Sequence, residues 1–188
     1  KREGDFIYLI GESKNDISSS EYLYSFHKVK ISPAPFFDLE VEHKIQNAVS
    51  NIIQKKLISS AHDVSDGGLF ITLLESAMVN NFGFEITSDK NIRRDAFLFG
   101  EAQSRVVVSV SESQHINFLK EISNLKVPFS KLGKVHGKNI LIVASHNSLR
   151  ALVKYIERIS VEEIVNFEIP FGGMIVYDLN QSLGVNQR

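Results

Sequence analysis

Short apolar runs rich in β-forming residues alternate along this chain with stretches whose apolar residues recur every three or four positions. The two periods belong to strands and helices respectively, because strand side chains alternate between faces while neighbours on a helix face lie three or four residues apart. This alternation predicts an α/β (α+β) fold in which a mixed sheet packs against helices. The sequence shows no internal repeat and no low-complexity segment.

The pattern also predicts where the elements lie. Asp38 is an expected helix N-cap, and Ser111 with Gln114 has the spacing of a capping box. Segments 12–35 and 89–105 are expected to be surface loops. The expected strands cover 6–10, 61–64, 84–87, 105–110, 129–135 and 139–144. The expected helices cover about 38–57, 67–80, 111–125 and 149–159.

Three parts follow from these elements. We expect residues 1–37 to form an N-terminal strand and an irregular connecting arm, and residues 38–160 to form the α/β domain. Residues 161–188 are an extension without an assignment from the sequence. The chain begins at Lys1 and enters a strand almost at once, which favours a piece of a longer protein over a complete processed chain.

Composition excludes several classes of function. The net charge of −1 argues against a general nucleic-acid binder, which needs a basic excess. No apolar stretch approaches the roughly 18 residues that a membrane span requires, and no signal peptide precedes the first strand. The absence of cysteine excludes disulfides and thiolate metal sites. We therefore expect a soluble cytoplasmic domain that binds neither nucleic acid nor membrane.

One charged, glycine-rich segment leads into an apolar helix that is expected to begin near Asp66 or Gly67. A helix start offers unpaired N–H groups to phosphate, glycines let a ligand approach the backbone, and Asp66 is also placed to cap the helix. Asp63 and Asp66 are candidate Mg²⁺ ligands. The alternative is a plain cap and tight turn, with His62 donating a hydrogen bond inside the fold. The candidate nucleotide- or phosphate-binding residues here are His62, Asp63, Ser65, Asp66, Gly67 and Gly68.

A second polar segment enters the strand expected at 105–110. If strand geometry begins early, Glu101, Gln103 and Arg105 share one face, and together with Ser104 they are candidate ligand contacts. The alternative is an internal ion pair between Glu101 and Arg105.

Taken together, these segments resemble the C-terminal part of the phosphoribosylformylglycinamidine synthase family. "AHDVSDGGL" followed by "FGEAQSR" is the specific part of the resemblance, which spans roughly residues 4–142. The matching segments, in chain order, are "GDFIYLIGE", "SEYL", "DLEVEHKIQNAV", "SAHDVSDGGL", "LFGEAQSRVVVSV" and "KLGKVHGKNILI".

The resemblance implies a fold like the C-terminal domain of aminoimidazole ribonucleotide (AIR) synthase, within an ATP-dependent ligase. ATP with Mg²⁺ would phosphorylate the amide oxygen of formylglycinamide ribonucleotide. Ammonia from a glutaminase subunit or domain would then displace phosphate to give the amidine. The chain resembles the second of two C-terminal-type domains in such a synthetase, which implies missing N-terminal-type partner domains and no catalytic residue of its own.

In that position the candidate residues imply contacts of a degenerate, non-catalytic nucleotide site, and the isolated chain is expected to be inactive. Two alternatives stay open. One is a purely structural or interaction domain of the same synthetase, and the other is a domain of a related ATP-using enzyme of the selenophosphate synthetase or thiamine-monophosphate kinase type. Because partner domains normally cover apolar surface, we expect the isolated chain to self-associate.

Overall fold

The structure is a computed structural model that describes residues 1–137, 146–168, 178–179 and 185–187. The chain divides into two compact units, Lys1–Leu141 and Ile142–Arg188. Among the described residues, no helix combines the length and apolar character needed to cross a bilayer.

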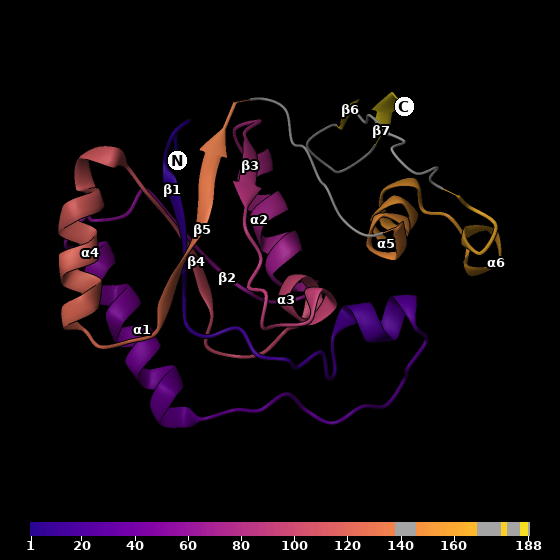
Figure 1. The fold of residues 1–188 in the computed structure, drawn as a ribbon, viewed down its shortest axis with the longest axis horizontal. Helices are drawn as coiled ribbons and strands as arrows, with labels where there is room; N and C mark the ends of the chain where they lie inside the picture. Colours follow the sequence, from indigo (N-terminus) through magenta and orange to yellow (C-terminus); the bar gives the residue numbers. More distant parts are fainter. Residues whose placement is uncertain (138–145, 169–177, 180–184, 188) are drawn as a thin grey trace. The chain divides into compact units, whose positions relative to one another are not determined.

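A five-stranded sheet forms the middle of the first unit (Figure 1). The strand order is β2-β4-β1-β5-β3, and every neighbouring pair is antiparallel. The α+β class is confirmed, but the expected mixture of strand directions is wrong. The strands are β1 (Phe6–Ile10), β2 (Ser60–Asp63), β3 (Gly83–Ile86), β4 (Val106–Val110) and β5 (Phe129–His136).

The connections explain the difference in strand direction. Strand–helix–strand alternation usually produces parallel neighbours. Here β1–α1–β2 and β4–α4–β5 each cross over one intervening strand, which runs antiparallel to both strands that it separates. No two strands of this sheet that follow one another in the sequence are therefore neighbours in space.

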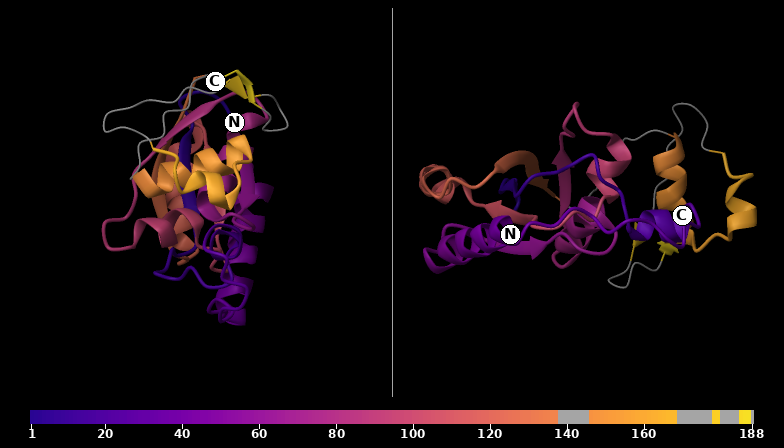
Figure 2. Two further views of the ribbon diagram at one scale, coloured as in Figure 1. Left: turned by 90° about the vertical axis from the view of Figure 1, so that its right-hand side faces the viewer. Right: turned by 90° about the horizontal axis from the view of Figure 1, so that it is seen from below.

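Helices cover both faces of the sheet, as Figure 1 and the right-hand view of Figure 2 show. On one face lie α1 (Leu39–Gln54) and α4 (His115–Asn124). On the other lie α2 (Gly68–Met78) and α3 (Arg94–Phe99). Because both faces are covered, all five residues of the central strand β1 are buried.

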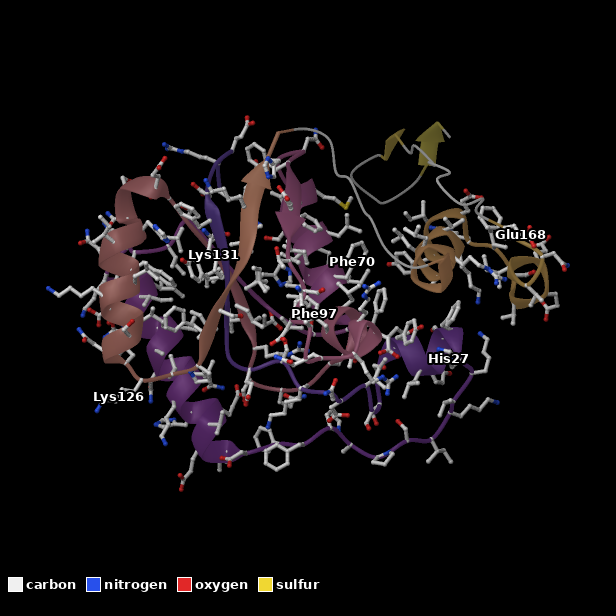
Figure 3. The ribbon with its side chains drawn as sticks, viewed as in Figure 1. His27, Phe70, Phe97, Lys126, Lys131 and Glu168 are labelled. Carbon is white, nitrogen blue, oxygen red and sulfur yellow. The ribbon has the colours of Figure 1, made fainter. Side chains whose placement is uncertain are left out.

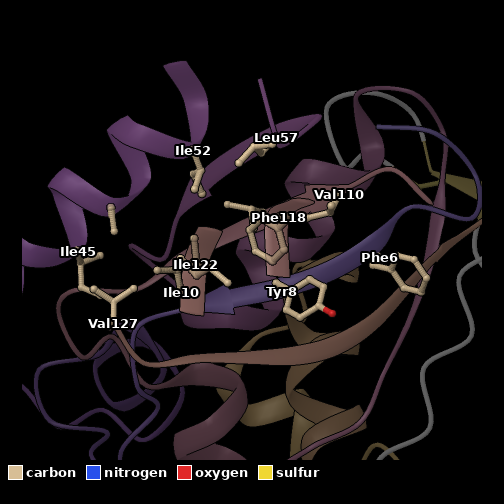
Figure 4. Close-up of a cluster of buried hydrophobic side chains, with 12 residues drawn as sticks. Phe6, Tyr8, Ile10, Ile45, Ile52, Leu57, Val110, Phe118, Ile122 and Val127 are labelled. Atoms are coloured by element: carbon tan, nitrogen blue, oxygen red, sulfur yellow. The ribbon is translucent and has the colours of Figure 1, made fainter. Parts of the chain in front are cut away.

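Alternate residues of β1 belong to the core beneath α1 and α4 (Figure 4). Phe6, Tyr8 and Ile10 point to this face, as the period of a strand requires. The rest of this core comes from the two helices, from β4 and from the turns beside them. Its other members are Ile45, Ala48, Ile52, Leu57, Val108, Val110, Phe118, Ile122 and Val127.

The two predicted helix caps have different outcomes. Asp38 caps α1 as expected, and its carboxylate accepts hydrogen bonds from the N–H groups of Glu40 and Val41 at 2.9 and 3.1 Å. The expected capping box before α4 is wrong. A 3₁₀ turn, Glu112–Gln114, precedes α4, and Ser111 makes no side-chain cap bond. Gln114 itself stands at the cap position of α4, so it is not where a capping box requires it.

Both expected loops contain a short helix. A π-helical turn, η1 (Tyr22–Phe26), interrupts segment 12–35, and α3 interrupts segment 89–105. Stacked aromatic rings join the two, with the ring centroids of Tyr22 and Phe99 4.9 Å apart. Helices this short are too brief to show a 3.6-residue period, so the pattern missed them.

The second unit contains two helices and a pair of short strands within its described part. These are α5 (His146–Glu157), α6 (Val161–Ile164), β6 (Asp178–Leu179) and β7 (Val185–Gln187). The expected strand 139–144 lies outside the described residues. The chain divides into its compact units between residues 141 and 142, whereas we expected boundaries at residues 37 and 160. The strand that we assigned to the arm, β1, is the middle strand of the sheet.

Candidate functional site

The two polar segments identified from the sequence meet at the start of α2. β2 ends at Asp63, which pairs with Val106 at the start of β4, so both segments adjoin the same end of this ladder. The N–H of Gly67 donates a hydrogen bond to Oε1 of Glu101 at 2.8 Å. The structure therefore joins the segments 60–68 and 101–105 into one region.

Two consecutive glycines begin α2 in the left-handed region, with φ of +84° at Gly67 and +71° at Gly68. A Cβ at Gly68 would lie 2.8 Å from the carbonyl oxygen of Gly100, so these glycines permit close packing of backbone on backbone. The expected cap by Asp66 is wrong. Gly67 occupies the N-cap position without any side-chain cap bond, and Asp66 is exposed.

Glu101 accepts hydrogen bonds from two backbone N–H groups, one of them at this helix start. Its Oε1 accepts hydrogen bonds from the N–H groups of Gly67 at 2.8 Å and Glu21 at 2.7 Å. Burial raises the pKa of Glu101, the two N–H bonds lower it, and the nearby carboxylates of Asp66 and Glu21 raise it, with a net rise. A carboxylate of the protein therefore occupies the place where the sequence suggested an external phosphate.

Arg105 points inward rather than toward a ligand, and is 3% exposed. Its Nε donates to the carbonyl oxygen of Ala102 at 3.0 Å, its Nη2 to that of Gly100 at 2.5 Å, and its Nη1 lies 3.5 Å from Oγ of Ser13. Burial lowers the pKa of Arg105 to about 10, against the attraction of Glu101, which raises it. No ion pair within 4.0 Å links Arg105 to Glu101 in the described part of the chain. Arg105 instead stabilises its own loop through its hydrogen bonds to the carbonyl oxygens of Ala102 and Gly100.

The remaining residues of the second segment face α1. β4 begins only at Val106, and Ser104 has a φ of +61°, so the shared strand face expected for Glu101, Gln103 and Arg105 is not formed. Ser104 donates a hydrogen bond to the carboxylate of Glu42 on α1. Gln103 is exposed, and with Ser104 it lines a cavity of about 620 Å³ between α1 and the ends of β2 and β4.

His62 and Asp63 lie at the end of β2. The Nδ1 of His62 is 2.8 Å from the carbonyl oxygen of Asp63, and its Nε2 is 3.4 Å from a carboxylate oxygen of Glu75. Asp63, Ser65 and Asp66 are exposed. Within the described residues, no group of three or more histidine, aspartate or glutamate side chains is placed to hold a metal ion.

Sequence reasoning missed two partners of this region, Glu21 and Ser13. Glu21 lies in "SEYL", and the buried Ser20 before it fixes that turn by donating to the carbonyl oxygen of Ile17 at 2.7 Å. The only available signal was the segment itself, because these contacts join residues about 80 positions or more apart.

Comparison with known proteins identifies the family to which this chain is similar. The family described as "AIR synthase related protein, C-terminal domain" matches residues 2–145. The "Phosphoribosylformylglycinamidine synthase subunit PurL" of Caldanaerobacter subterraneus subsp. tengcongensis is 41% identical over 143 residues, which are 76% of this chain and 19% of that protein. The protein of the same name from Methanocaldococcus jannaschii is 32% identical over 145 residues, 75% of this chain and 19% of the relative.

Solved structures share the fold. The structure described as "T. maritima PurL complexed with FGAR" has a TM-score of 0.63 at 16% identity, covering 75% of this chain and 26% of that one. "Structure of PurLQS from Thermotoga maritima" has a TM-score of 0.56 at 17% identity, covering 75% and 24%. The present chain thus spans about a fifth of the length of the curated relatives it matches. With the family matching residues 2–145, the chain belongs to the AIR synthase related proteins and carries their C-terminal domain.

Proposed function

We propose that this chain is a C-terminal-type domain of a phosphoribosylformylglycinamidine synthase and is inactive alone. The observation that carries the proposal is the 41% identity over 143 residues to a PurL subunit of which the chain spans 19%. In this function ATP phosphorylates the amide oxygen of formylglycinamide ribonucleotide, and ammonia then displaces phosphate to form the amidine.

Related structures support the use of ATP and the presence of partners. One T. maritima PurL structure is described as complexed with ATP, another as complexed with FGAR, and a third is of PurLQS. The proposal therefore includes ATP with Mg²⁺, N-terminal-type domains of the same synthetase, a glutaminase subunit or domain, and a ribonucleotide substrate.

The candidate nucleotide site enters this proposal as a degenerate one. Glu101 accepts a hydrogen bond from the N–H of Gly67 at the start of α2. The guanidinium of Arg105 donates hydrogen bonds to carbonyl oxygens of its own loop. A phosphate approaching this point would meet a carboxylate rather than free donors. The ligands of the working ATP and Mg²⁺ site then belong to the missing domains.

A domain exchange tests the function. Residues 2–145 replace the matching segment of the C. subterraneus PurL subunit, and amidine formation from FGAR, ATP and ammonia is measured. We expect an active chimera and no activity from the 188-residue chain by itself. A chimera that unfolds at the temperature of the parent yet forms no amidine, although its unmodified parent does, would refute the assignment.

A second candidate, a non-catalytic interaction domain of the same synthetase, is favoured by one observation. Large apolar side chains are exposed along the segment that leads into α1, and Ile31 is 91% exposed. The exchange also provides a test of this role. If the chimera is active, the same chimera with the exposed residues of this segment made polar loses activity through failed assembly rather than through lost chemistry. The exposed residues are Val29, Ile31, Phe36 and Phe37 before α1, and Leu39 and Val41 in its first turn.

A further inference from the structure

Strand β5 carries a bulge where it pairs with β1. Ile7 pairs with Gly133, but the next residue of β1, Tyr8, pairs with Lys131, so the register shifts by one residue between them. Side chains alternate between the faces of a sheet, and a regular ladder would therefore turn Lys131 toward α2 and α3. The bulge turns it instead to the face that carries Lys134. Two lysines three positions apart thus share one face.

The two lysines also share one aromatic ring. Their Nζ atoms lie 4.5 Å (Lys131) and 4.7 Å (Lys134) from the centroid of Phe6. Both side chains are exposed, and Figure 3 shows Lys131 between α4 and the strands. Within the described part of the chain, neither ammonium group forms an ion pair. Two positive charges beside the same ring repel one another, and an anion bound to both relieves that repulsion.

Two further polar groups border the lysines. The ring of His115 stacks on Phe6 with centroids 3.9 Å apart, and its Nε2 lies 2.7 Å from the hydroxyl of Tyr8. His115 is also the first residue of α4, and its backbone N–H donates a hydrogen bond to the carbonyl oxygen of Glu112 in the preceding 3₁₀ turn. Burial and Lys131 lower the pKa of His115, Glu112 raises it, and Lys134 lowers it, with a net decrease.

We propose that Lys131, Lys134 and the His115–Tyr8 pair form a binding site for the phosphate group of a small phosphate monoester. Lysine binds phosphate as a point charge, and a dianion matches two ammonium groups better than a carboxylate does. The imidazole, which stacks on the Phe6 ring, and the Tyr8 hydroxyl next to it add hydrogen-bonding capacity to the site.

The acidic groups nearby leave this charge unmatched. Glu85 pairs across the ladder with Lys134, but its carboxylate lies 3.2 Å from Nε2 of His136. The exposed carboxylate of Glu112 raises the pKa of His115 through its charge, and the carbonyl oxygen of Glu112 accepts a hydrogen bond from the backbone N–H of His115. The site lies on the face covered by α1 and α4, and it does not depend on the proposed ligase function.

Isothermal titration of the 188-residue chain with inorganic phosphate and with glycerol 3-phosphate, at constant ionic strength, tests the site. Glycerol serves as the uncharged comparison. The double variant Lys131→Gln/Lys134→Gln removes both ammonium groups. Lys120→Gln/Lys126→Gln is the matched control, because it removes the same charge from α4 and the turn after it, whereas the ammonium groups over the Phe6 ring belong to Lys131 and Lys134. Figure 3 shows Lys126 apart from Lys131.

We expect saturable binding of both phosphates to the natural chain and to the control, and binding weakened by about tenfold or more in the Lys131/Lys134 variant. The His115 imidazole gives a readout that needs no variant. A bound dianion raises the pKa of His115 in an NMR titration, because negative charge favours the imidazolium. Equal weakening in both double variants, glycerol 3-phosphate binding no better than glycerol, or a His115 pKa unmoved by phosphate would each overturn the proposal.

Discussion

At the scale of single residues, Glu101 shows how a side chain can replace an expected ligand. Both N–H donors, from Gly67 and Glu21, bond to the same oxygen, Oε1. Glu101→Gln therefore keeps both hydrogen bonds, whereas Glu101→Ala leaves two backbone donors without their partner. We expect the free energy of unfolding of the alanine variant to be about 1–3 kcal/mol lower than that of the glutamine variant, as measured by urea denaturation.

Glu101 also predicts a pH dependence. Its folded pKa is raised above the ordinary value, so the folded state holds the proton more tightly than the unfolded state. The stability that it contributes is fully present below the ordinary pKa and is lost as pH rises through the raised one. Glu101→Gln should remove this decline from a pH series of denaturation curves, while Glu12→Gln, at an exposed position, should retain it. Parallel curves for the natural chain and Glu101→Gln would contradict the assignment.

Gly11 and Gly4 allow backbone strain from a positive φ to be compared with a steric clash of an added Cβ. Both have positive φ, of +100° and +87°, but a Cβ at Gly11 would lie 2.0 Å from the carbonyl oxygen of Ser104, whereas nothing lies within 4 Å at Gly4. Gly11→Ala should therefore lower the free energy of unfolding by about 2 kcal/mol more than Gly4→Ala. Similar thermal unfolding midpoints for the two variants would show that the backbone around Gly11 shifts to accommodate the Cβ without a loss of stability.

The structure brings the two segments predicted from the sequence together, but the contacts of their residues differ from those expected. Segments 60–68 and 101–105 do meet, and each is rich in groups suited to phosphate. Their roles depend on contacts between distant residues, such as Glu101 with Glu21, 80 positions away, and Arg105 with Ser13, 92 positions away. Local chemistry cannot reveal that a guanidinium is buried against carbonyl oxygens.

At the scale of elements, regular periodicity was predictable and topology was not. The expected strand 6–10 coincides with β1, and α1 begins after its expected cap. The short helices η1 and α3 depend on aromatic stacking between segments far apart in the chain, which no local period records. The antiparallel order arises from crossovers that skip a strand, and hydrophobic patterns do not specify which strand is skipped.

The starts of α1 and α2 give a prediction at this scale. Asp38 accepts two backbone hydrogen bonds at the start of α1, whereas Asp66 makes no cap bond at the start of α2. Asp38→Ala should lower the free energy of unfolding by about 1 kcal/mol, and Asp66→Ala should change it by less than about 0.5 kcal/mol. Denaturant titration of both variants at one pH measures the difference, and equal losses would mean that Asp66 supports α2 in another way.

At the scale of the whole molecule, the segment before α1 predicts self-association. Phe36 and Phe37 are 60% and 52% exposed, beside further apolar side chains on the same segment. Exposed apolar surface of this kind drives association in water. The natural chain should show a concentration-dependent sedimentation coefficient, which Phe36→Ser/Phe37→Ser should abolish. Tyr24→Ser, at another exposed aromatic residue, is the control, and a monomeric natural chain at all concentrations would contradict the prediction.

The strand order also governs how the protein is made. β1 leaves the ribosome first, yet its two neighbours, β4 and β5, end only at Val110 and His136. No hairpin of adjacent strands can form in the meantime, since every ladder of this sheet joins segments that are distant in sequence, and such topologies fold slowly. During synthesis the five apolar residues of β1 therefore have no partner before β4 is made and only one of their two partners before β5 is made, and such states are prone to aggregation. A nascent chain halted before Phe129 should need a chaperone to remain soluble, and one released after His136 should not.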